Sequence, residues 1–271
     1  MDNRAIGFFD SGVGGLTSIP PVLRNLPDEN IIYYGDTARA PYGSKSKETI
    51  EYFSSEIADF LARHNVKMIV AACNTVSATC LEQLRTEHPE IPIIGVVSPT
   101  VKVAEKCCAA GDHVGVIATR ATIKSGTYEK KLKEKRPDLK VFSAACPAFV
   151  PLIEEGIIKN QIMDLTIQYY LDEFIRKNNI RDLILGYTHY PLIEEEISKL
   201  YPDLHIISSS AEVSKAVELE LKKRDGLAEP RKAEHLFFAS DISNHFIRLL
   251  WSISEGNRDA FHVGIFHGQE Y

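Results

Sequence analysis

The chain has 271 residues, of which 44% are hydrophobic and 25% are charged, and its formal net charge is −6. This composition is that of an ordinary globular protein and excludes a disordered or fibrous chain. The length fits two compact domains or one large α/β unit. The negative net charge argues against general binding to nucleic acid or to anionic membranes, so we expect neither as a partner. The first residues lack the basic and apolar stretches of a signal peptide, which predicts a cytoplasmic protein.

Short apolar runs alternate with helical segments along the chain. Because the runs are too short for helices and are rich in Ile and Val, they predict buried parallel strands. The expected strands are, in chain order, residues 6–9, 31–34, 68–72, 93–97, 114–118, 141–145, 183–185, 205–207 and 235–241. The alternation predicts an α/β fold with helices on both faces of mainly parallel sheets.

Two of the intervening segments have a clear apolar face at helical spacing. The first begins after Ser46, a suitable cap, and carries Glu48 in its first turn. Its apolar face consists of Ile50, Phe53, Ile57, Phe60 and Leu61. The face of the second consists of Met163, Ile167, Tyr170, Leu171 and Phe174. Each helix directly precedes an expected strand.

The sequence contains a weak internal repeat. Residues 63–75 match residues 177–189 in character at most positions, and residues 5–11 resemble residues 113–119. We therefore expect two pseudo-symmetric α/β domains with a boundary near residues 98–100. Since the strand at 235–241 follows the second half, the C-terminus is expected to return to the first domain. The predicted domains are residues 1–98 plus 209–271, and residues 99–208.

Polar residues stand at the carboxyl ends of the expected strands, where open α/β sheets bind their ligands. They are Asp10, Ser11, Asp36, Cys73, Asn74, Thr75, Thr119, Thr122, Tyr187, Thr188 and His189, with the loop 41–43 after the second strand. If the two halves face each other, Cys73 and Tyr187 approach one cleft from opposite sides.

Cys73 is the first candidate for chemistry, because a strand end followed by a helix start can stabilise a thiolate. The alternative is a buried core cysteine. Asp10, Glu154 and His189 are charged groups that could orient or activate the thiol. Each also has an ordinary interpretation: Asp10 as a turn cap, Glu154 as a solvated carboxylate and His189 as a structural histidine.

The glycine-rich loop at residues 10–16 does not have the spacing of a nucleotide-binding loop. We expect its amides to hold a small anionic ligand instead. The five cysteines form neither paired zinc spacings nor an even disulfide set. We therefore expect no metal and no cofactor.

Five segments together resemble bacterial glutamate racemase. They are residues 10–16 (DSGVGGL), 35–43 (GDTARAPYG), 72–75 (ACNT), 146–151 (CPAFVP) and 185–192 (LGYTHYPL). The resemblance extends in order over roughly residues 5–241. It implies two α/β domains with the active site between them, and no pyridoxal phosphate or metal. It also implies interconversion of L- and D-glutamate for peptidoglycan synthesis.

The resemblance makes Cys73 one catalytic acid/base and makes Asp10, Glu154 and His189 supporting residues. The implied substrate site consists of Asp10, Ser11, Tyr42, Gly43, Asn74, Thr75, Thr188 and His189, to which the strand ends add Thr119 and Thr122. The departure is at the second catalytic position, where the family has Gly-Cys-Thr-His and this chain has Gly186-Tyr187-Thr188-His189.

Racemisation without a cofactor needs a base on each face of the α-carbon. A thiol, with an ordinary pKa of about 8.5, suits this task better than a phenol at about 10. The larger ring also occupies substrate space or turns away and leaves no base. The sequence therefore predicts a racemase impaired by Tyr187, although Tyr187 as a proton donor or an occluding lid stays open.

Two other functions stay open. One is a related Cys-dependent racemase, isomerase or decarboxylase that acts on aspartate, a hydantoin or another substrate. The other is a non-catalytic ligand-binding protein on the same scaffold. A homodimer is the alternative to core packing for the apolar C-terminal residues Phe237, Phe238, Phe246, Ile247, Leu249, Leu250 and Trp251.

Overall fold

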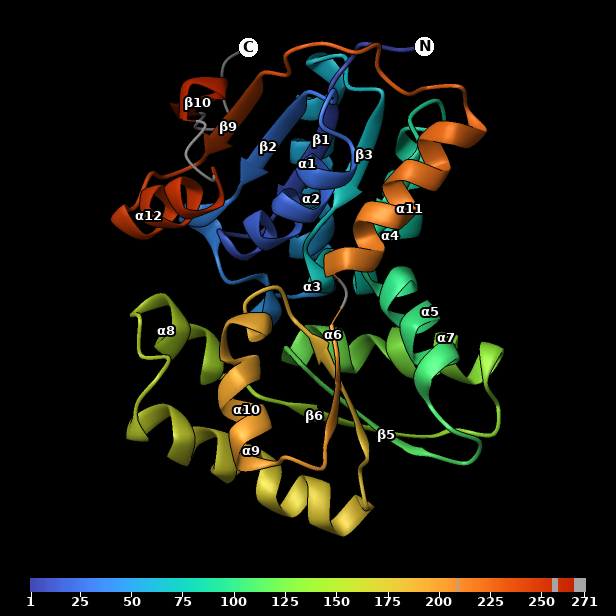
Figure 1. Ribbon diagram of the computed structural model, residues 1–271, viewed down its shortest axis with the longest axis vertical. Helices are drawn as coiled ribbons and strands as arrows, with labels where there is room; N and C mark the ends of the chain where they lie inside the picture. The colour runs from blue at the N-terminus through green and yellow to red at the C-terminus, as the bar shows by residue number, and fades with distance from the viewer. Residues whose placement is uncertain (209, 255–257, 266–271) are drawn as a thin grey trace. The chain divides into compact units, whose positions relative to one another are not determined.

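The computed structural model describes residues 1–208, 210–254 and 258–265 (Figure 1). It divides into two compact units, which are Met1–Val96 with Ser210–Tyr271, and Val97–Ser209. The sequence placed the first division at residues 98–100, but these residues lie inside helix α5 (Val97–Cys107). Of the helices in the described ranges, none is both long and apolar enough to cross a membrane.

Unit 1 contains a six-stranded sheet in the order β10-β9-β2-β1-β3-β4, and all its pairings are parallel. The strands are β1 (Ile6–Asp10), β2 (Ile31–Gly35), β3 (Met68–Ala71), β4 (Ile93–Gly95), β9 (His235–Ala239) and β10 (Phe261–Ile265). The strand β9 confirms that the chain returns to the first sheet. The sequence did not predict β10, in which only Phe261 is buried.

One face of this sheet packs on helices α1, α11 and α12. Their bounds are α1 (Ile19–Asn25), preceded by the 3-10 helix η1 (Gly14–Ser18), α11 (Ser210–Lys223) and α12 (Asn244–Ile253). Ile6 and Phe8 of β1 lie in one apolar cluster with Phe246 and Leu250 of α12. The apolar C-terminal residues of α12 therefore pack in the core of unit 1.

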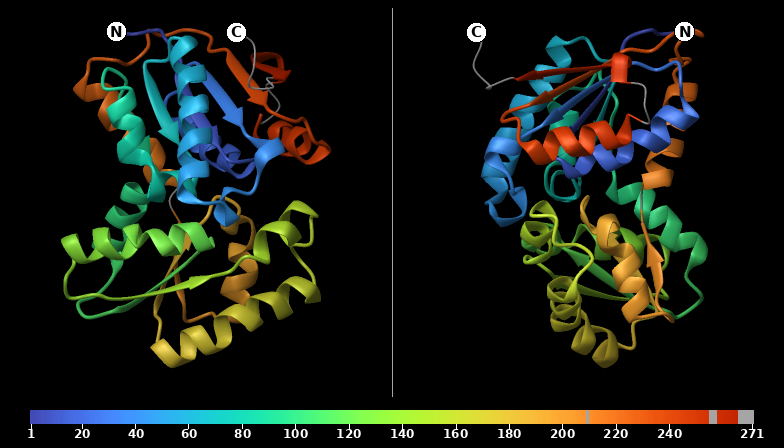
Figure 2. Two further views of the ribbon diagram at one scale, coloured as in Figure 1. Left: turned by 180° about the vertical axis from the view of Figure 1, so that it is seen from behind. Right: turned by 60° about the vertical axis from the view of Figure 1, so that its left-hand side comes forward.

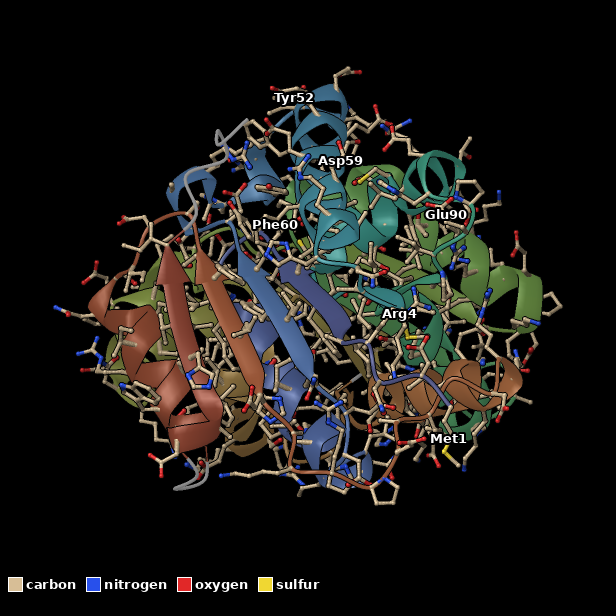
Figure 3. The ribbon with its side chains drawn as sticks, turned by 90° about the horizontal axis from the view of Figure 1, so that it is seen from above. Met1, Arg4, Tyr52, Asp59, Phe60 and Glu90 are labelled. Atoms are coloured by element: carbon tan, nitrogen blue, oxygen red, sulfur yellow. The ribbon has the colours of Figure 1, made fainter. Side chains whose placement is uncertain are left out.

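The other face is covered by α2 (Lys47–Arg63), next to α3 (Asn74–Thr79) and α4 (Leu81–Glu87). Ser46 caps α2 as predicted, because its hydroxyl accepts a hydrogen bond from the Thr49 amide at 3.2 Å. Phe60 of α2, which Figure 3 labels, is buried. Its ring packs against Tyr34 of β2 and Phe238 of β9, with 5.2 Å between ring centroids in each pair. The sheet of unit 1 thus has helices on both faces (Figure 2).

Unit 2 contains a four-stranded parallel sheet in the order β6-β5-β7-β8. The strands are β5 (His113–Ala118), β6 (Lys140–Ala145), β7 (Asp182–Gly186) and β8 (His205–Ile207). The helices α8 (Phe149–Glu154), α9 (Gln161–Asn178) and α10 (Glu194–Leu200) supply one apolar cluster with β5 and β7. The helices α5, α6 (Arg120–Ser125) and α7 (Thr127–Lys135) contact the same sheet. Short 3-10 helices are η2 (Thr37–Arg39), η3 (Tyr42–Ser44), η4 (Tyr190–Ile193) and η5 (Arg258–Ala260).

The internal repeat of the sequence is present in the structure. The strand order β2-β1-β3-β4 of unit 1 has the same pattern as β6-β5-β7-β8 of unit 2. The turns before β3 and β7 contain Asn65 and Asn179, which coincide in the sequence overlay, and both have left-handed backbones with φ of 55° and 50°. Asparagine tolerates this conformation better than most residues. The overlay makes Tyr187, just after β7, the counterpart of Cys73, just after β3.

Candidate active site

Cys73 directly precedes α3 and lies close to the end of β1. The parallel pairing of β1 with β3 aligns Phe9 with Ala71, which brings the residues after both strands together. The Cys73 thiol donates a hydrogen bond to the Ser11 hydroxyl at 3.4 Å between sulfur and oxygen. The prediction that these strand ends meet is thus confirmed within unit 1.

The Cys73 thiol is fully buried, and burial raises its pKa to about 12. The negative charge of Asp10 raises the pKa further, whereas hydrogen bonds from Ser11 and the Val76 amide lower it. A raised pKa favours the neutral thiol, which is the proton-donating form. A substrate cation near the sulfur would favour the thiolate.

Amides of the glycine-rich loop bind the Asp10 side chain of the same loop. The Asp10 carboxylate accepts hydrogen bonds from the amides of Gly12 and Gly15, both at 3.1 Å. A Cβ added at Gly15 would lie 2.6 Å from the Cβ of Asp10, so only glycine allows this approach. The expectation that the loop amides hold an anionic ligand is wrong for these two amides, because the carboxylate of the same loop already occupies them.

Tyr42 and Gly43 are buried in η3, and a polar network fixes this loop. The Tyr42 hydroxyl donates to the buried Asp36 carboxylate. That carboxylate also accepts from Arg39 Nε at 2.7 Å and from the Ser240 hydroxyl at 2.9 Å. Burial, and then the Asp36 charge, raise the pKa of Tyr42 far above its ordinary value. Ser240 had no signal in the sequence beyond its place in the expected strand 235–241.

Asn74 and Thr75, the remaining predicted residues of unit 1, are buried in the first turn of α3, next to Cys73. In unit 2, Thr119 and Thr122 form a corresponding hydroxyl pair. Thr119 caps α6 by accepting from the Thr122 amide at 3.2 Å, and the two hydroxyl oxygens are 3.0 Å apart. Both side chains are buried.

The residues after β7 pack as an aromatic group within unit 2. Tyr187 is only 3% exposed, and its ring lies nearly parallel to the His189 imidazole, at 5.2 Å between centroids and 17° between planes. The Tyr187 ring also packs against the Tyr190 ring, at 5.4 Å between centroids. The pairing of Ala118 with Gly186 places Thr119 and Tyr187 at neighbouring strand ends.

His189 connects this group to α8. Its Nε2 atom lies 3.4 Å from Glu154 Oε1, and its Nδ1 atom lies 3.4 Å from the Thr188 hydroxyl. His189 and Thr188 are buried, whereas the Glu154 side chain is 41% exposed. The predicted residues thus form two groups, one at the strand ends of each unit. Over the described ranges, no cluster of three or more His, Cys, Asp or Glu side chains could hold a metal ion.

The model of the Asp/Glu/Hydantoin racemase family matches residues 18–216, which is more than half of the chain. The chain belongs to the Asp/Glu/Hydantoin racemase family. A family member from Persephonella marina, a glutamate racemase, is 47% identical over 90% of this chain and 91% of that protein. The glutamate racemase of Geobacter metallireducens is 42% identical over 92% of each chain.

A solved racemase of this family has the same fold over its whole length. The glutamate racemase of Francisella tularensis, solved in complex with D-glutamate, is 38% identical, and each chain is covered to 100% with a TM-score of 0.92. The resemblance inferred from five sequence motifs is thereby confirmed, as is the α/β fold.

Proposed function

We propose that this racemase interconverts L- and D-glutamate, and that Cys73 is one of its two acid/base groups. The observation that carries the proposal is the buried Cys73 thiol held by Ser11 beside Asp10, in a chain 47% identical to a glutamate racemase. The proposed substrate contacts come from both groups of strand-end residues. They are Asp10, Ser11, Tyr42, Gly43, Asn74, Thr75, Thr119, Thr122, Thr188 and His189.

The proposed reaction is a proton transfer across the α-carbon. A base on one face takes the α-proton, and the electron pair of the broken C–H bond delocalises into the α-carboxylate. An acid on the opposite face then donates its own proton to the carbon, which inverts it. Since no more than one face is accessible to Cys73, a second group is required, and precise positioning of both supplies much of the rate.

Tyr187 is proposed to make this enzyme a weak racemase. It is the counterpart of Cys73 in the repeat, and its ring packs against His189 and Tyr190 inside unit 2. A phenol with an ordinary pKa of about 10 is a poor match for proton transfer near neutral pH. We therefore expect slow inversion of glutamate, together with a faster exchange of its α-proton that Cys73 catalyses.

Incubation of each glutamate enantiomer in deuterated water tests the proposal. One enantiomer should exchange its α-proton without inversion, and Cys73→Ala should abolish that exchange. Racemisation at a rate equal to that of the two-thiol relatives would refute the impairment. If neither enantiomer exchanges in a Cys73-dependent way, the proposed function fails.

The alternatives predict different outcomes. A relative with another substrate would exchange aspartate or a hydantoin faster than glutamate in the same assay. A non-catalytic protein would bind D-glutamate without any exchange, even as Tyr187→Cys.

We further propose a cytoplasmic location, which the five free thiols support because reducing compartments keep cysteines unpaired. A homodimer stays a prediction, which light scattering on the purified chain would test.

A further inference from the structure

Within the part of the chain that the structure describes, one ring nitrogen of His189 is buried without a hydrogen bond, which is unusual for a purely structural histidine. Its side chain is 1% exposed, yet Nε2 makes no hydrogen bond of acceptable geometry with any of the described residues. The nearest carboxylate oxygen, Glu154 Oε1, is 3.4 Å away, which is close enough for an ion pair but not for a good hydrogen bond. A buried polar atom without a partner is costly, so it indicates a role with a ligand.

Three neighbours surround this imidazole. Glu154 Oε1 lies 3.4 Å from Nε2, where the carboxylate can pair with an imidazolium that forms during the reaction. The Thr188 hydroxyl lies 3.4 Å from Nδ1. The Tyr187 ring lies flat against the imidazole at 5.2 Å and 17°, and an aromatic face also stabilises a neighbouring cation.

The phenol of Tyr187 is less suited to the task. Its ring belongs to the apolar cluster under α8, α9 and α10, between His189 and Tyr190. A buried phenol resists ionisation because burial penalises the charged form. An imidazole, in contrast, changes charge near neutral pH in ordinary surroundings.

We propose that His189, stacked on Tyr187 and paired with Glu154, is the second acid/base of this enzyme in place of the missing thiol. The inference rests on the proposed function and names the group that acts opposite Cys73. In one direction, neutral His189 takes the α-proton at Nε2 and becomes an imidazolium, while the Cys73 thiol donates its proton to the other face. In the reverse direction the Cys73 thiolate takes the proton and the imidazolium returns one, so charge and protons balance in both.

Exchange of the α-proton in deuterated water, followed separately for each enantiomer, tests this assignment. One enantiomer should depend on Cys73 and the other on His189. His189→Ala should lower exchange of the second enantiomer by about 100-fold, the lower range for loss of a general acid/base. Free imidazole should restore part of that exchange, because it can enter the space left by the side chain.

Two further variants separate chemistry from structure. His205→Ala removes another histidine of unit 2, which pairs with Asp182 at 2.7 Å near the opposite end of the sheet, and should show no enantiomer-specific loss. Tyr187→Phe removes the phenol hydroxyl but keeps the ring, so it should retain exchange of the second enantiomer. When Tyr187→Phe is combined with His189→Ala, free imidazole should again restore part of that exchange.

The assignment is overturned if His189→Ala slows both enantiomers equally, if imidazole restores nothing, or if Tyr187→Phe alone abolishes exchange of the second enantiomer. These outcomes differ from failure of the proposed function, in which the Cys73-dependent exchange of the first enantiomer would itself be absent.

Discussion

Replacing Tyr187 by cysteine should raise racemase activity and lower stability at once. The variant restores a thiol at the counterpart of Cys73, so inversion should accelerate by about 10²–10⁴-fold, the usual contribution of a positioned acid/base. It also deletes the ring of a residue that is only 3% exposed, and this ring contacts both His189 and Tyr190.

The cost in stability follows from this packing. Truncation of a buried Phe to Ala lowers the free energy of unfolding by about 3–5 kcal/mol, from lost transfer energy and the cavity left behind. Cysteine keeps a sulfur atom in part of that volume, so we expect a loss of roughly 2–4 kcal/mol. At about 4 °C per kcal/mol for a domain of this size, the melting temperature should fall by roughly 8–16 °C.

Racemisation followed by circular dichroism and thermal unfolding by calorimetry would measure both effects. Tyr169→Cys is the matched control, because Tyr169 lies in the same unit and is 82% exposed. It should change neither quantity. An unchanged melting temperature for Tyr187→Cys would refute the packing argument, and unchanged turnover would refute the argument that position 187 lacks a competent base.

Three further predictions concern unit 1. Asp10→Asn removes a like charge beside Cys73 and should lower the pKa of the thiol below about 12, so iodoacetamide should label Cys73 faster at pH 8, as read by mass spectrometry; an unchanged rate would contradict the electrostatic cause. Lys67→Met removes the ammonium that lies 2.5 Å from the buried Glu29 carboxylate. It should lower the free energy of unfolding in urea by about 3–5 kcal/mol. The control Lys133→Met, which breaks an exposed pair, should lower it by less than about 1 kcal/mol. Because the pKa of Cys73 rises from 9.0 to about 12 on folding, the folded state keeps a proton that the unfolded chain loses; stability should fall between these pH values, and Cys73→Ser should weaken the fall.

The strands could be predicted from the sequence because most are short runs of buried apolar residues. The structure confirms all nine expected strands to within a few residues, including 205–207 without change. The missed strand β10 has four of five residues outside the core, so its apolar signal is weak. The expected boundary at 98–100 lies within a few residues of the division between Val96 and Val97, and it falls inside the start of α5. A proline in the first turn of a helix loses no hydrogen bond, and α5 therefore begins before Pro99.

The site was predictable where parallel strands fix their neighbours. Cys73 and Ser11 follow adjacent strands, so their contact follows from the fold class. The contact between Asp36 and Ser240 does not, because 204 positions separate them and only the pairing of β9 with β2 joins their strands. The parallel stacking of Tyr187 on His189 could not be predicted from the sequence either, because it depends on how side chains pack within the unit.

The order in which the chain emerges from the ribosome matters for a sheet assembled from both ends of the sequence. Residues 97–209 are continuous, so unit 2 can complete its four strands as soon as they are synthesised. Unit 1 cannot, because the outer edge of β2 stays open until β9 arrives about two hundred residues later. An open strand edge invites pairing with other chains. During synthesis, the β2 edge of the nascent first half is therefore a site where another chain can pair until β9 covers it.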